Sequence, residues 1–196
     1  MGVEGGVFAL IDMPDVVEEY FKIKQKNHDR FIRMIQSSPL EWINFGDNIH
    51  CGTLPANLFE KYVLPDYHPR MEELHRPDKY YYPFAHWDGD TRNILKYAQE
   101  TGLDAIEAIT PEPQGDVTVE EIKKHLGDKV GLIDGIAATL FNETYPIKML
   151  EEQALKLIDL FAGKLILGIS DEMSSIGNID RVKFITELVE KHNASC

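Results

Sequence analysis

Two residues with useful chemistry directly follow an apolar, aromatic segment of the chain. They are His86 and Asp88, and the segment before them is 80–85. If that segment is a strand, a spacing of two places both side chains on the same side of the extended chain. An imidazole beside a carboxylate can hold a metal ion or move a proton. A strand-end histidine can equally be an ordinary hydrogen-bonded residue, and spacing alone leaves both interpretations open.

Acidic residues end the other apolar segments. Asp47 follows the first, Glu107 lies at the end of the third, and Asp171-Glu172 follow the last. Parallel α/β proteins carry their chemistry at the carboxyl ends of the strands. These acids are therefore candidates for one shared site. Asp47 also has a structural interpretation, because an Asp before Asn48 is typical of an Asx-turn.

Some of the remaining polar residues have structural interpretations that compete with function. Asp134-Gly135 is as typical of a turn as of a strand end. Asp90 precedes the segment 91–101 and is predicted to cap that helix. Cys51 follows a predicted strand and could supply a thiolate, although a free loop cysteine is the favoured interpretation.

Short apolar segments alternate with amphipathic ones along the whole chain. The predicted strands are 42–45, 80–85, 105–108, 130–133 and 165–169, and the predicted helices are 14–35, 55–74, 91–101, 119–126, 146–161 and 180–191. Asp12 ahead of Pro14 predicts a helix start, as does the capping-box pair Thr118 and Glu121. Strict alternation predicts a parallel sheet with right-handed crossovers.

Two architectures share this alternation, an open doubly wound sheet and an arc of a barrel. The glycine-rich phosphate loop of a dinucleotide-binding sheet is missing, because Gly2, Gly5 and Gly6 precede the first strand. At 196 residues the chain is short for a complete barrel, which needs roughly 200 to 250 residues. Both architectures predict one α/β domain over residues 1–196. In a barrel arc, exposed strand edges would favour pairing with another chain.

Charge and composition narrow the function classes. The net charge of −13 disfavours binding to phosphate backbones and anionic lipid. No apolar run is long enough to span a membrane, and the N-terminus has no basic leader. The two cysteines, Cys51 and Cys196, predict no disulfide framework. We expect a cytoplasmic protein that acts on a small molecule, with no nucleic-acid or membrane partner.

An ordered series of segments between residues 5 and 191 resembles the uroporphyrinogen-decarboxylase-like superfamily. The segments are 42–49, 58–65, 86–90, 101–107, 110–117 and 127–136. The resemblance implies a (β/α)8 TIM barrel, of which this chain is the C-terminal part, about the last five βα units. The family's N-terminal strands have no counterpart here.

Within the superfamily, the chain is most similar to the corrinoid-linked methyltransferase branch. That branch uses a zinc ion held by a His-x-Cys pair and a second Cys, and its methyl group passes to or from a corrinoid carried by a partner protein. Carboxylates stand at the thiolate positions here, which implies a harder site for a divalent metal ion acting as a Lewis acid. The resemblance implies the metal ligands His86, Asp88, Asp171 and Glu172, and the catalytic residues Asp47, His86 and Glu107.

Other outcomes stay open at this point. A tetrapyrrole decarboxylase would use Asp47 and His86 to contact its substrate, but the histidine that the decarboxylases carry after the last strand is absent from 170–175. The chain could also be an inactive truncated or split-barrel subunit. In either barrel interpretation we expect a homo-oligomer or pairing with the missing barrel half. Demethylation of a methoxyl or methylamine compound is the substrate class that the methyltransferase branch implies.

Overall fold

A five-stranded parallel sheet forms the centre of the computed structural model, which describes residues 2–194. Its strands are β1 (Trp42–Asn44), β2 (Tyr82–His86), β3 (Ala105–Glu107), β4 (Gly131–Ala137) and β5 (Leu165–Ser170). Each strand pairs in parallel with the next one along the chain, so the spatial order is β1-β2-β3-β4-β5. The predicted α/β class and parallel sheet are confirmed, and the order lacks the reversal of a doubly wound sheet.

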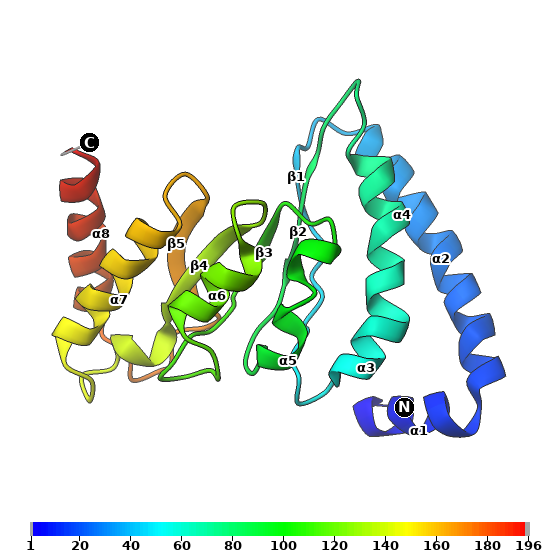
Figure 1. Cartoon of the computed structure of the whole chain (residues 1–196), viewed down its shortest axis with the longest axis horizontal. Coiled ribbons are helices and arrows are strands. Elements are labelled where there is room, and N and C mark those ends of the chain that lie inside the picture. Colours follow the sequence, from blue (N-terminus) through cyan, green and yellow to red (C-terminus); the bar gives the residue numbers. More distant parts are fainter. Residues whose placement is uncertain (1, 195–196) are drawn as a thin grey trace.

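Helices connect successive strands and extend beyond both ends of the sheet (Figure 1). They are α1 (Gly2–Asp12), α2 (Pro14–Gln36), α3 (Ala56–Leu58), α4 (Leu64–Leu74), α5 (Arg92–Leu95), α6 (Val119–Leu126), α7 (Ile147–Leu160) and α8 (Ile179–Asn193). Three short turns supplement them: a π-helical turn at Phe59–Val63 and 3-10 turns at Ala98–Glu100 and Ala138–Phe141. Within residues 2–194, none of the helices combines the length and the apolar character needed to cross a bilayer.

Helices cover one face of the sheet. The opposite face, which carries the exposed Trp42, Tyr82 and Ile166, is called the bare face below. Right-handed crossovers between sequential strands all place their helices on the same side. Pro83 and Ala85 of β2 are buried on the covered side. On the opposite side Trp42 is 53% exposed, Tyr82 39% and Ile166 53%. Trp42 stacks on its register partner Tyr82 with ring centroids 5.2 Å apart, so the bare face carries an aromatic band.

Large aromatic side chains fill the space between the sheet and the helices. Phe59 and Trp87 are fully buried, and their rings meet edge to face with centroids 5.2 Å apart. Tyr97 stacks on Phe59 at 5.5 Å. Leu157 of α7 and Phe161, the residue after that helix, belong to the same core. The core thus holds β2 and its neighbours against the helical layer and fixes the strand ends.

Two helix starts differ from the sequence prediction. Asp12 does not cap α2, because residues 2–12 are themselves helical and Met13 occupies the cap position. Asp90 does not cap α5 either. The Asp116 carboxylate takes that role, accepting from the backbone N–H groups of Thr91 at 2.9 Å and Arg92 at 3.2 Å. A cap supplied from a distant loop leaves no local sequence signal.

The capping box at the start of α6 is confirmed. The Thr118 hydroxyl accepts from the Glu121 backbone N–H at 3.2 Å, and the Glu121 carboxylate accepts from the Thr118 backbone N–H at 2.8 Å. The predicted helix 55–74 is instead divided into α3, the π-helical turn and α4. Pro65 lies at the start of α4, where its missing N–H costs least, and this accounts for the break.

Candidate functional site

The segment from His86 to Asp88 prolongs β2 and separates its side chains onto two faces. The Trp87 backbone N–H donates to the Glu107 backbone carbonyl at 3.0 Å, and the Asp88 backbone N–H donates to the Ile49 backbone carbonyl at 3.1 Å. The Trp87 side chain is fully buried in the core, whereas His86 and Asp88 are half-buried. Because side chains alternate along an extended chain, His86 and Asp88 share the face opposite to Trp87.

Asp171 reaches the same place from the end of β5. The buried Ser170 anchors that end, since its hydroxyl donates to the Ile109 carbonyl at 2.9 Å and accepts from the Gly135 N–H at 3.0 Å. Asp171 follows with φ of 62°. One donor atom from each of His86, Asp88 and Asp171 lies within 4.8 Å of the other two. We call these three residues the carboxylate–histidine cluster.

Glu107 orients the histidine of the cluster. The His86 Nδ1–H donates to Glu107 Oε2 at 3.1 Å, and Asn44 Nδ2 donates to the same oxygen at 3.0 Å. With its amide nitrogen facing Asp88, Asn48 donates to both oxygens of that carboxylate, at 2.8 and 3.2 Å. These hydrogen bonds fix the imidazole tautomer, which leaves the Nε2 lone pair of His86 free for a ligand.

Asp134 adds another acidic group to this end of the sheet. Burial and the negative charge of Glu107 raise the pKa of Asp134 to about 6, against the opposing effect of His86. Of the two interpretations of Asp134-Gly135, the turn is wrong, because both residues lie inside β4. Asp134 bends the strand with φ of 78°, a conformation that Asp tolerates better than most residues.

The strand ends around the cluster carry unusual backbone. Among the described residues, positive φ outside glycine occurs at Ala108 (66°), Asp134 (78°) and Asp171 (62°). They follow or interrupt β3, β4 and β5 respectively. Such conformations cost free energy and concentrate at functional sites. Their gathering beside His86 and Glu107 supports a functional role for this edge of the sheet.

The raised pKa of Asp134 predicts a pH-dependent stability. The folded-state pKa of about 6 exceeds the usual 3.8, so the folded protein loses stability as pH rises from about 4 to 6. The Asp134→Asn substitution removes this loss of stability with rising pH, and asparagine also adopts a positive φ. In metal-free buffer we expect Asp134→Asn to raise the free energy of unfolding at pH 7 by about 1 kcal/mol, after discounting for partial exposure.

Denaturant titrations at pH 4 and pH 7 measure this effect. At pH 4 the variant and the original chain are expected to agree. Asp159→Asn, on the exposed side of α7, is the matched control and should change neither value. A variant that gains nothing at pH 7 would contradict the buried-carboxylate explanation.

The other predicted site residues lie outside the cluster. The Asp47 carboxylate accepts a hydrogen bond from the Tyr67 hydroxyl at 2.7 Å and lines a cavity between β1, α2 and α4. Glu172 is exposed and does not belong to the cluster, although it adjoins Asp171. Cys51 is a half-buried free thiol, as the favoured interpretation predicts, and Cys196 lies outside the described residues.

Sequence reasoning missed two supporting residues. Asn44 and Asn48 were seen only as parts of a strand and a turn, yet each bonds a carboxylate of the site. A strand-end asparagine next to several strand-end acids was the available signal. It is weak, because asparagine is also the ordinary residue of a turn.

The donor set decides which chemistry the cluster can perform. One imidazole nitrogen and two carboxylate oxygens are ligands that hard or borderline divalent ions accept. Three protein ligands leave room for water or substrate in a further position. The oriented tautomer of His86 and the hydrogen-bonded Asp88 are the supporting contacts that metal ligands usually have. The residues therefore fit a divalent metal ion.

No family model matches the sequence, and no curated protein matches it. The resemblance to the uroporphyrinogen-decarboxylase-like superfamily accordingly stays a prediction.

Proposed function

We propose that this chain is part of a metal-dependent methyltransferase of the uroporphyrinogen-decarboxylase-like superfamily. The observation that carries the proposal is the carboxylate–histidine cluster, in which donor atoms of His86, Asp88 and Asp171 approach within 4.8 Å of one another. Two of these residues come from the end of β2 and the third from β5. Their convergence supports three of the four ligand positions that the family resemblance implies, and Glu172 does not belong to the cluster.

The bound ion, zinc or another divalent metal, would act as a Lewis acid toward a methyl donor such as a methoxyl or methylamine compound. The chain's own residues would prepare the site. Glu107 holds the His86 ring in one tautomer, and Asn44 holds Glu107. Asn48 restrains Asp88. A corrinoid protein would be the partner that exchanges the methyl group.

A tetrapyrrole decarboxylase is the less favoured alternative. Its substrate carries several carboxylates, whereas the site gathers the acids Asp88, Glu107, Asp134 and Asp171. Arg92, the arginine nearest to a strand end in the sequence, is engaged elsewhere and bonds Glu121 and the Asp116 carbonyl. Like charges at this density disfavour a polyanionic substrate.

Metal titration tests the proposal. We expect the chain to bind about one Co²⁺ with a visible absorption change typical of nitrogen and oxygen ligands. Asp171→Asn should weaken binding at least about tenfold, because it removes a charged ligand. Glu172→Gln is the matched control, one residue away, and should bind as the original chain does. The proposal would be wrong if Asp171→Asn and Glu172→Gln changed the Co²⁺ affinity equally, or if neither the variants nor the original chain bound Co²⁺.

The bare sheet face supports the barrel part of the proposal. Sequential parallel strands with helices on one side are the arrangement of a barrel arc. The exposed Trp42, Tyr82 and Ile166 then correspond to the inside of a closed barrel. We propose that the remaining barrel units cover this face in the complete assembly.

The isolated chain lacks the units proposed to cover the bare face, so we expect it to self-associate. Exposed apolar patches and unpaired strand edges drive association. In sedimentation velocity we expect concentration-dependent oligomers, and Ile166→Lys should shift the distribution strongly toward monomer. Ile147→Lys places the same charge on the helical layer and serves as the control. A monomeric original chain at all concentrations would count against the open arc.

A further inference from the structure

A cavity of about 850 Å³ lies between α2, α4 and β1; His86, Asp88 and Asp171 do not line it, although Asn44 and Asn48 do. Its apolar walls include Phe21, Phe31, Ile43, Phe45 and Tyr62. Pockets that hold small organic molecules have about this volume and are largely apolar with few polar groups. The cavity therefore has the size of a ligand site, and charged and amide side chains join its apolar wall.

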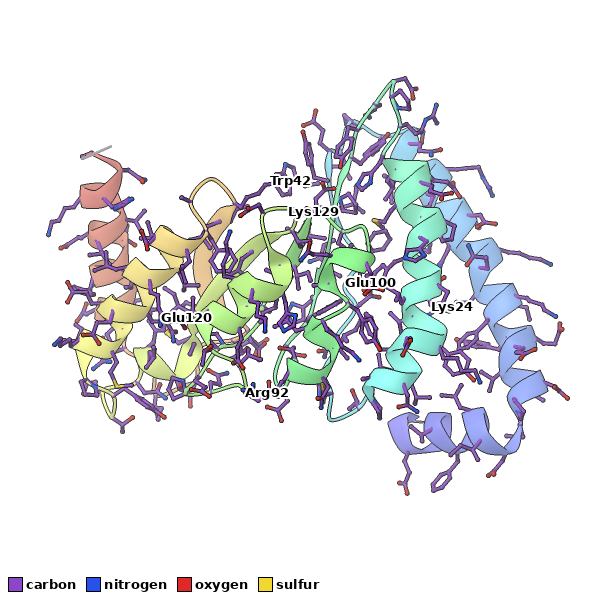
Figure 2. All side chains as sticks on the ribbon, in the orientation of Figure 1. Lys24, Trp42, Arg92, Glu100, Glu120 and Lys129 are labelled. Carbon is purple, nitrogen blue, oxygen red and sulfur yellow. The ribbon has the colours of Figure 1, made fainter. Side chains whose placement is uncertain are left out.

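Cationic groups gather in this cavity, in contrast to the rest of the chain. Lys24, Lys61 and Arg70 line it, against the acids Asp47 and Asp66. Burial raises the pKa of Asp47, which makes its negative charge less favourable there. Figure 2 shows Lys24 on α2, on the side that leads toward α4. In a chain with a net charge of −13, this local excess of cations favours an anionic ligand.

Arg70 is the buried cation of the cavity. Only 6% of the residue is exposed, and its guanidinium lies over the Phe45 ring at 5.4 Å. Its Nη2 contacts His28 Nδ1 and Asp66, whereas its buried Nε has no partner in the described part of the chain. A buried N–H without an acceptor costs about 1 to 3 kcal/mol. An oxygen of a ligand would remove that cost.

His28 engages the Nη2 group of Arg70. Because a guanidinium can only donate, the His28 Nδ1 atom accepts, and the ring proton resides on Nε2. Burial and the neighbouring Arg70 lower the pKa of His28, so its ring stays neutral near pH 7. His28 therefore accepts one N–H of the guanidinium, and its own N–H lies on the side of the ring away from that contact.

We infer that this cavity binds a small carboxylic acid with an aromatic or branched apolar body. The carboxylate would accept from the Arg70 Nε–H, whose neighbour Nη2 already donates to Asp66 and His28. The apolar body would lie against Phe45, Ile43 and Phe21. Lys24 would add a longer-range attraction, since its side chain is exposed.

Binding of sodium benzoate to the metal-free chain tests this inference, with benzamide as the neutral probe of the same shape. By calorimetry or chemical-shift titration we expect benzoate to bind at least about tenfold more tightly than benzamide. Arg70→Lys keeps the charge and loses the Nε–H donor, and should weaken benzoate binding about tenfold. Lys24→Gln should weaken it severalfold. Arg30→Gln, on α2 outside the cavity, is the control and should leave binding unchanged.

Equal affinity for benzoate and benzamide would overturn the inference. It would also be overturned if Arg70→Lys and Lys24→Gln both left the affinity for benzoate unchanged, as Arg30→Gln is expected to do. If Arg70→Lys does not fold, the benzoate-to-benzamide ratio in Lys24→Gln decides. All titrations contain a chelator and are repeated with Asp171→Asn. Benzoate binding should survive both, so that a failure here is distinct from a failure of the proposed metal site.

Discussion

Replacement of His86 by alanine is expected to lower the affinity of the chain for Co²⁺ or Zn²⁺ by at least about a hundredfold. His86 is the nitrogen ligand of the carboxylate–histidine cluster, and Asp88 and Asp171 alone would offer two carboxylates. Two oxygen ligands on a half-open surface bind borderline metals poorly. Competition with a chromogenic chelator measures the change.

The Glu107→Gln substitution tests whether Glu107 positions the ligand His86 or is itself a metal ligand. Glu107 binds no metal in this proposal but accepts the His86 Nδ1–H at 3.1 Å. The amide leaves the ring in place while weakening that hydrogen bond, so affinity should fall about tenfold, less than for His86→Ala. His68→Ala, on the exposed side of α4, is the control. A larger loss for Glu107→Gln than for His86→Ala would show that Glu107 is itself a ligand and that the cluster is wrongly assigned.

The sequence predicted the fold through periodicity and failed where distant contacts decide. The strands that lead to the site were predicted to within two residues at their starts, because short buried strands read as apolar runs. β4 extends to Ala137 instead of ending at 133, since Asp134-Gly135 resembles a turn and only pairing with β5 keeps it in the sheet. Helix α1 was not predicted because its three glycines disfavour helix.

The site was predictable as far as strand-end acids are visible in the chain. His86, Asp88 and Asp171 could be grouped because parallel strands end at one edge, and the structure brings them together. Asp47 was placed with them by the same rule, yet its carboxylate is bonded to Tyr67 beside the cavity at α4. The rule gives the edge of the sheet, but it does not tell which face a residue two or more positions past the strand will take.

Gly115→Ala is expected to destabilise the fold by about 3 kcal/mol or more, among the largest losses for a single added methyl group. A Cβ at this position would lie 2.0 Å from the Thr110 carbonyl oxygen and 3.2 Å from the Gly89 carbonyl oxygen. Both are backbone atoms, and Thr110 is buried, so neither can rotate away. The loop between β3 and α6 would have to move as a whole.

The displacement should extend to neighbouring elements and so be visible in more than one measurement. Asp116, the next residue, caps α5 through Thr91 and Arg92, and that contact would be disturbed as well. We expect the thermal midpoint to fall by about 6 to 12 °C for a chain of this size. Gly6→Ala is the control: its added Cβ meets nothing within 4 Å, and alanine favours the helix there. A Gly115→Ala variant as stable as Gly6→Ala would mean that the Thr110 carbonyl does not lie against Gly115 as described.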